Sequence, residues 1–128
     1  MKVLFDAIYD KFVTDGKYGL TALYNTEADD EAVYPYGVFS LVNNRTDMDG
    51  DFEVDDEDCL IQFNLFSADD TSTVINAAYT LLKNAFHKFD LVVADHNTIS
   101  LIKVNANLLR VEKVWRYNVT FRLQIQLV

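Results

Sequence analysis

The C-terminal run of the chain alternates strictly between apolar and polar residues, and this pattern constrains the fold more than any other feature. Side chains of a β-strand point alternately to the two faces of a sheet. The period of two therefore predicts a long strand with one face in a core and the other in water. The apolar positions are Trp115, Tyr117, Val119, Phe121, Leu123, Ile125 and Leu127, and the polar ones are Arg116, Asn118, Thr120, Arg122, Gln124 and Gln126.

The length of this strand sets a second constraint. A straight strand over Val114–Val128 would span roughly 50 Å, whereas a compact domain of this size is only about 36 Å across. Either the C-terminal hairpin projects and is completed by a neighbouring subunit, or a bulged strand coils over its own helix. The preceding segment changes phase, with apolar residues at odd positions to Leu101, at even positions from Ile102 to Leu108, and at odd positions again from Leu109. This change predicts bulges or a bend in the penultimate strand.

Two stretches have the spacing of amphipathic helices. Apolar residues four apart, at Leu4, Ile8 and Phe12, predict a helix over Lys2–Thr14 that Asp15-Gly16 ends with a left-handed cap. A longer set predicts a helix over Asp69–Lys88, capped by Ser67 or Asp69. Its apolar members are Val74, Ile75, Ala78, Leu81, Leu82, Ala85, Phe86 and Phe89.

Shorter β-like segments lie between the helices. They are Leu20–Tyr24, Tyr34–Val42 and Cys59–Phe66, separated by the acidic loop Thr26–Glu31 and the polar loop Asn43–Asp58. The order predicts an α+β fold: a mainly antiparallel β-sheet with a long amphipathic helix packed on one face and a short N-terminal helix. Since no linker, repeat or change of composition divides the chain, we expect residues 1–128 to form a single domain.

Composition excludes several classes of function. The formal charge is −9 and the pI is about 4.4, which opposes binding to nucleic-acid phosphates but allows DNA to pass nearby. A single Cys allows no intramolecular disulfide. Asp6 interrupts the apolar start that a signal peptide needs, and no apolar run is long enough to cross a membrane. We therefore expect a soluble chain without a membrane partner.

The residues that carry chemistry are few. The acidic stretch Asp47–Asp58 fails as an EF-hand, because loop position 6 is Phe52 rather than Gly and position 12 is Asp58 rather than Glu. We expect this stretch to be a solvated hairpin loop. Cys59 falls on the apolar phase of its strand and predicts an inert core thiol, while His87 and His96 are expected at the surface. The sequence thus predicts no catalytic residue, no metal, no cofactor and no enzymatic role.

Other residues are candidates for contact between subunits. Arg116 and Arg122 lie on the polar face of the last strand, in contrast to the acid-rich loops. A head-to-tail contact between such surfaces would close into a ring. Ile125 is the third candidate, near the end of that strand. The aromatic group Tyr34, Tyr36, Trp115 and Tyr117 fits either an interface or ordinary packing.

This succession of segments resembles the tail terminator, or tail-completion, proteins of long-tailed phages and prophages. The resemblance lies in Tyr34–Phe39 entering a strand after an acidic loop, and in Leu60–Ser67 running into the helix Thr71–Phe89. It ends in a hairpin that closes with Val114–Leu123 and covers nearly the whole chain.

The resemblance implies an α+β virion structural protein, assembled in the host cytoplasm, that forms a hexameric ring at the tail or neck. Such a ring would stop polymerisation of the tail-tube protein, join the tail to the head connector protein and let DNA pass without specific binding. No cofactor would be needed. The acidic residues Asp47, Asp49, Asp51, Asp55 and Asp56 would then contact the lumen or a partner. Two alternatives stay open: another neck or tail-tube ring subunit, or a small ligand- or metal-binding domain that uses the loop 47–58.

Overall fold

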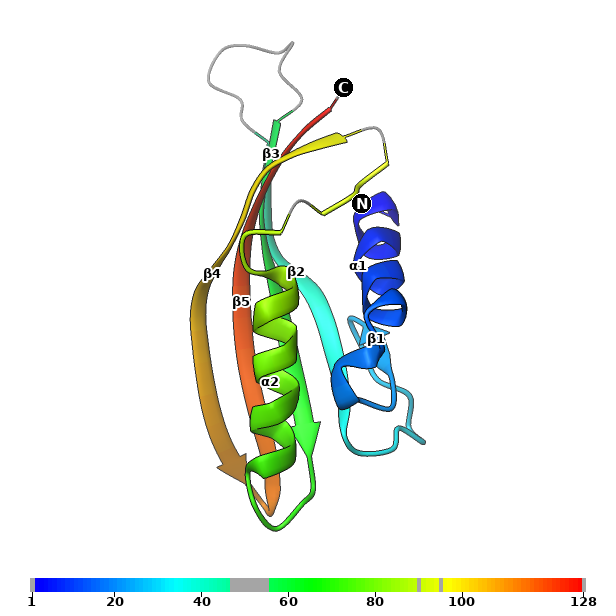
Figure 1. Cartoon of the computed structure of the whole chain (residues 1–128), viewed down its shortest axis with the longest axis vertical. Helices are drawn as coiled ribbons and strands as arrows, with labels where there is room; N and C mark the ends of the chain where they lie inside the picture. Colours follow the sequence, from blue (N-terminus) through cyan, green and yellow to red (C-terminus); the bar gives the residue numbers. More distant parts are fainter. Residues whose placement is uncertain (1, 47–55, 90, 95, 128) are drawn as a thin grey trace.

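The computed structural model describes residues 2–46, 56–89, 91–94 and 96–127, which form two helices, one 3₁₀ turn and a five-stranded sheet (Figure 1). The elements, in chain order, are α1 (Lys2–Thr14), η1 (Lys17–Gly19), β1 (Leu23–Asn25), β2 (Tyr36–Thr46), β3 (Asp56–Ser67), α2 (Thr73–Phe86), β4 (His96–Val111) and β5 (Val114–Leu127).

The strands follow the order β1-β2-β3-β5-β4 across the sheet. Strand β1 runs parallel to β2, and the other three pairs are antiparallel. The α+β prediction is confirmed, but the sheet is mixed, because the connection between β1 and β2 brings the chain back to start β2 beside the beginning of β1. Strand β5 therefore lies inside the sheet, while β1 and β4 form its two edges.

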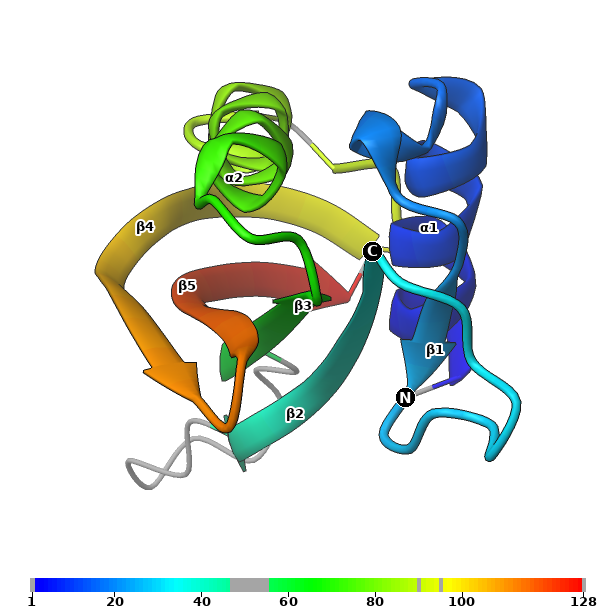
Figure 2. The same cartoon turned by 90° about the horizontal axis from the view of Figure 1, so that it is seen from below.

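Both helices lie on the same side of the sheet, as the view along the strands shows (Figure 2). The apolar phase of β3 and β5 faces them, and the directly paired residues Ile61 and Phe121 are among the most deeply buried. Helix α1 contributes Leu4, Ile8 and Phe12 to the same core, and α2 contributes Ile75, Leu82 and Phe86. The alternation predicted for the last strand, β5, is confirmed, and β3 alternates between buried and less buried residues in the same way.

Phe63 holds the centre of this core and is fully buried. Its ring centroid lies 5.2 Å from that of Phe86 on α2, 5.7 Å from Phe121 on β5 and 6.2 Å from Phe39 on β2. Rings at these separations attract one another beyond simple area burial. One side chain thus ties three strands to α2, which at 14 residues is not the long helix predicted beside a short one, since α1 has 13.

The penultimate strand has the predicted irregularities. The register between β4 and β5 shifts once between Thr98 and Ser100 and again between Lys103 and Asn105. Each shift inserts an extra residue and increases the local bend and twist. The two strands curve together beneath α2 (Figure 2), so the long hairpin follows the core of its own chain.

Two predicted boundaries are wrong. Helix α2 runs over Thr73–Phe86 and not Asp69–Lys88, and its N-cap residue is Ser72 rather than Ser67 or Asp69. The Ser67 hydroxyl instead accepts a hydrogen bond from the Asp69 N–H at 3.3 Å, within a turn that precedes the helix. On the helix Leu81 is 50% exposed, because the buried face is narrower than the apolar pattern.

The predicted loop Asn43–Asp58 is also too long. Asn43–Thr46 pair with Glu57–Leu60 in the β2–β3 ladder, and Asp56 pairs with Gln126 of β5, because strand pairing satisfies backbone groups whatever the side chains are. The end of α1 follows the prediction, with Gly16 in the left-handed region at φ 86°.

The central position of Phe63 predicts a large loss of stability on truncation. We expect Phe63→Ala to lower the free energy of unfolding by about 3–5 kcal/mol, since it leaves a cavity among three other rings. Phe63→Leu should cost clearly less. Urea unfolding, followed by the fluorescence of Trp115, measures both. Val92→Ala, at a side chain that is 83% exposed, serves as the control and should change stability by less than about 0.5 kcal/mol.

Candidate functional site

None of the described elements covers the face of the sheet away from the helices, and this face carries the polar phase of β5. At its centre Asn118 pairs directly with Asn64 on β3 and with Asn107 on β4. The next row contains Gln62, Thr120 and Asn105. This face therefore presents neutral amides and hydroxyls more than charge.

The two arginines of this face are engaged within the chain. Arg116 donates from Nε to the Asn118 side-chain oxygen at 2.9 Å, and its guanidinium lies 5.6 Å from the ring centroid of Phe66. Arg122 forms a two-point ion pair with Asp58, from Nε to Oδ1 at 2.9 Å and from a terminal nitrogen to Oδ2 at 2.5 Å. Hydrogen bonding to this carboxylate raises the pKa of Arg122. Each arginine remains exposed, with a geometry fixed by its neighbours.

The other predicted contact residues are placed differently. Ile125 is fully buried in the core of the chain itself, so its side chain does not reach the surface. Asp56 pairs through its backbone with Gln126 at the start of β3. Asp47, Asp49, Asp51 and Asp55 lie outside the described residues.

Aromatic side chains gather where β1 and β2 begin. Tyr36 stacks on Phe66 with centroids 5.0 Å apart, and it also contacts Tyr34 at 5.3 Å and Tyr24 at 6.0 Å. Burial raises the pKa of Tyr36, with smaller contributions from its two tyrosine neighbours. Tyr34 is 42% exposed, which leaves part of this cluster open to a partner.

The second half of the predicted aromatic group lies elsewhere. Tyr117 stacks face to face on Tyr79 of α2 at 4.0 Å, so it belongs to the packing between helix and sheet. Trp115 is half-buried under the guanidinium of Arg110, 4.6 Å from its ring. The sequence does not distinguish these roles, because Tyr34 and Tyr36 have the same spacing of two as Trp115 and Tyr117.

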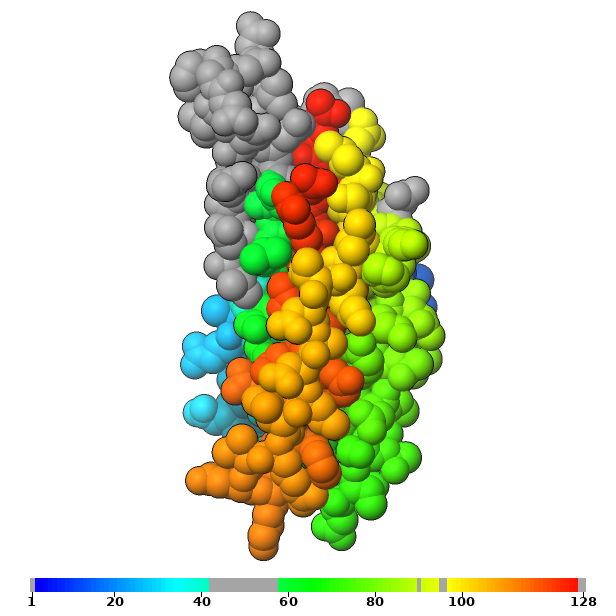
Figure 3. Space-filling view, turned by 90° about the vertical axis from the view of Figure 1, so that its left-hand side faces the viewer, coloured from blue at the N-terminus to red at the C-terminus, as the bar shows by residue number. Residues whose placement is uncertain are grey.

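The edge strand β4 has a row of apolar side chains that are exposed to solvent. Those exposed are Ile99, Ile102, Val104, Leu109 and Val111, with exposed fractions between 39% and 58%. Figure 3 shows β4, coloured yellow to orange, as a strip along the molecule. A long apolar edge of this kind is a template for pairing with another chain. The sequence pattern does not reveal this edge, since it predicts a strand without showing whether the strand lies at an edge of the sheet.

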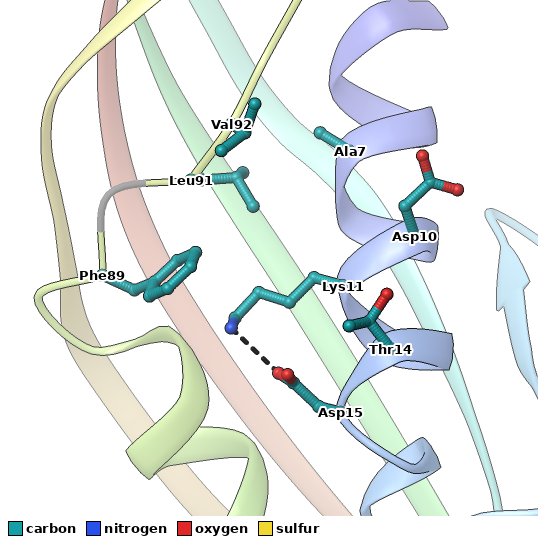
Figure 4. A pocket seen from close by; sticks show the side chains of 8 residues that line it. All are labelled: Ala7, Asp10, Lys11, Thr14, Asp15, Phe89, Leu91 and Val92. Atoms are coloured by element: carbon teal, nitrogen blue, oxygen red, sulfur yellow. Dashed lines mark ion pairs between the residues drawn. The ribbon is translucent and has the colours of Figure 1, made fainter.

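A cavity of about 270 Å³ lies between α1 and the segment that follows α2 (Figure 4). Its one lysine, Lys11, is held by the Asp15 carboxylate at 2.9 Å and by the Phe89 ring, whose centroid is 3.5 Å from Nζ. Tyr18 donates a hydrogen bond to the same carboxylate at 2.7 Å. The ammonium group is thus occupied by structural contacts.

Two of the remaining candidates for chemistry can be placed. Cys59 is fully buried, as predicted. His87 is half-buried and not at the surface as expected, because its Nδ1 accepts a hydrogen bond from the Lys103 backbone N–H at 3.0 Å. The side chain of His96 lies outside the described residues.

Among the residues that the structure describes, no group of three His, Cys, Asp or Glu side chains could hold a metal ion. In the same part of the chain, no helix is long and apolar enough to cross a membrane.

The contacts of Asp15 predict a pH-dependent contribution to stability. Hydrogen bonding from Lys11 holds the pKa of Asp15 below its ordinary value of 3.8. A carboxyl whose pKa is lower in the folded state stabilises the fold above the unfolded pKa and loses this effect as the pH falls through the folded value. We expect Asp15→Asn to cost about 1 kcal/mol at pH 7. Urea unfolding at pH 7 and pH 3 should show the gap to the native chain narrowing at pH 3; an equal gap would contradict this account.

Comparison with known proteins places this geometry in a structural context. No family model and no curated protein matches the sequence. A solved structure does match: a chain of the virion of a native gene transfer agent particle, with a TM-score of 0.76 and 19% sequence identity. The match covers 94% of this chain and 92% of the other. The two proteins share a fold.

Proposed function

We propose that the chain is a structural subunit of a phage-like virion, located at the tail or neck. The observation that carries this proposal is the fold shared, over nearly the full length of both chains, with a component of a gene transfer agent virion. The resemblance of Tyr34–Phe39 and of Leu60–Ser67 with its following helix to tail terminators points the same way. A structural role also agrees with the cavity beside α1, because the ammonium group of Lys11 there is already paired with Asp15.

The finer proposal is a ring, with six copies, at the head-proximal end of the tail. The ring would stop polymerisation of the tail tube and offer the docking face for the head connector. Two features support it: an apolar edge strand on one side of the sheet and a partly open tyrosine cluster on the other. Because these surfaces differ, contact between them is head-to-tail, and such contacts close into rings when the rotation allows.

A ring of this kind can let DNA through without holding it. The uncovered face of the sheet is rich in amides, and Arg122 is neutralised there by Asp58. Binding to the phosphate backbone depends on free Lys and Arg side chains that displace counterions. The net charge of −9 works in the same direction, and no specific binding of DNA is expected.

Deletion of the gene from the genome that encodes this chain tests the function directly. Electron microscopy of the lysate should show tubes of irregular length without attached heads, since nothing stops tube growth or joins the two parts. Expression of the gene in trans should restore particles of uniform tail length.

The same experiment separates the alternatives. Loss of a tube subunit would leave no tubes, and loss of a neck protein other than the terminator would leave separate tails of normal length. Either result would contradict the terminator role. Particles that assemble normally would contradict a structural role altogether.

A further inference from the structure

The two edges of the sheet both have backbone groups that face away from the sheet at corresponding positions. Val111 and Val114 pair across a two-residue turn, and the ladder alternates from there. Ala106, Leu108 and Arg110 consequently turn their N–H and C=O groups outward, away from β5. Within the described chain no backbone hydrogen bond to these groups is found.

The rest of the β4 edge is partly closed by His87 and Lys88, which directly follow α2. The Leu101 carbonyl accepts a hydrogen bond from the Lys88 N–H at 2.7 Å, and the Lys103 N–H donates to His87. These two contacts cap the edge beside the second bulge. The stretch Ala106–Arg110 therefore remains as the open part of this half of the strand.

Strand β1 forms the edge on the opposite side. The Ala22 carbonyl and the Thr26 N–H bond to β2, so the backbone groups of the even-numbered residues face inward and those of Leu23 and Asn25 face outward. The Asn25 carbonyl also accepts a hydrogen bond from the Glu27 N–H at 2.8 Å, and Leu23 is 5% exposed. A groove of about 310 Å³ runs along this edge, between β1 and the Phe5–Tyr9 side of α1. Tyr9 on its wall is 48% exposed.

The register places the two open stretches level with each other. One continuous row of paired residues crosses the sheet from Tyr24 through Val38, Asn64 and Asn118 to Asn107. The neighbouring rows connect Leu23 with Leu108 and Asn25 with Ala106. A rotation about an axis along the strands would thus bring β4 of one copy beside β1 of the next.

Strand direction and charge also fit this contact. Strand β1 is parallel to β2, and three antiparallel pairings separate β2 from β4, so the two edge strands run in opposite directions. Rotation keeps these directions, and the meeting strands are antiparallel. Strand β4 contains Lys103 and Arg110 and no acidic residue, whereas residues 18–44 contain four acids and no basic residue. The four acids are Glu27, Asp29, Asp30 and Glu31, all exposed.

We propose that the Ala106–Arg110 edge of β4 pairs, in antiparallel orientation, with the β1 edge of a second copy of this chain, so that the sheets of neighbouring subunits become continuous. This inference rests on the proposed ring and names the surfaces that close it. Apolar side chains such as Val104 and Leu109 would be covered by the neighbour, and the edge would no longer be open to other chains.

Cross-linking with matched cysteine variants tests the contact. Tyr24 and Asn107 lie at the two edges, in one row of paired residues and therefore on the same face of the sheet. The double variant Tyr24→Cys/Asn107→Cys, treated with a short flexible bismaleimide, should give a ladder of covalent oligomers up to the full ring on a denaturing gel. Each single variant should stay monomeric on the gel, as should the native chain, whose Cys59 is buried.

The other outcomes separate this inference from the proposed function. Covalent dimers from Asn107→Cys alone would show β4 paired with β4 of another copy and would overturn the proposal. Rings in native mass spectrometry without cross-links in the double variant would overturn the edge contact and leave the ring intact. A native chain that remains at 14.7 kDa at every concentration would contradict both.

Discussion

The long antiparallel pairing of β3 with β5 is the constraint on which the rest of the structure depends. Its register runs from Asp56 opposite Gln126 to Ser67 opposite Trp115 without a break. Because side chains alternate, this one register puts Phe63 and Phe121 on the helix side and Asn64 and Arg122 on the open side. A slip by one residue would exchange the two faces, so core and exposed surface are fixed together.

From this pair the sheet grows outward to two very different edges. On one side lie β2 and the three-residue β1, next to α1; a partly exposed tyrosine cluster lies where these two strands begin, and an acidic loop follows β1. On the other side β4 has sixteen residues, two register shifts and a row of exposed apolar side chains. Proteins normally blunt such edges with charges, proline or short strands. In the proposed ring this edge is covered, because the β1 edge of a second copy would supply the matching strand.

Much of the fold could be predicted from periodicity, while the surfaces could not. The alternation of β5 and the four-residue spacing of α1 report burial directly, so these elements followed from the sequence. The ends of α2 and the pairing of Asn43–Thr46 depend on backbone hydrogen bonds that cannot be predicted from a polar sequence. The ion pair of Arg122 with Asp58 joins residues 64 apart in sequence, which no local pattern predicts. The open edge of β4 depends on strand order, which no local pattern encodes.

Amide hydrogen exchange of the assembled and the monomeric chain tests the central claim most directly. The monomer is obtained by dilution and the ring at high protein concentration, and amide exchange is measured at the same pH in both states. The account predicts that the amides of Ala106, Leu108 and Arg110 gain protection on assembly, whereas those of Asn107 and Leu109, which pair with β5 in either state, change little. Unchanged exchange at the first three amides in a proven ring would contradict it.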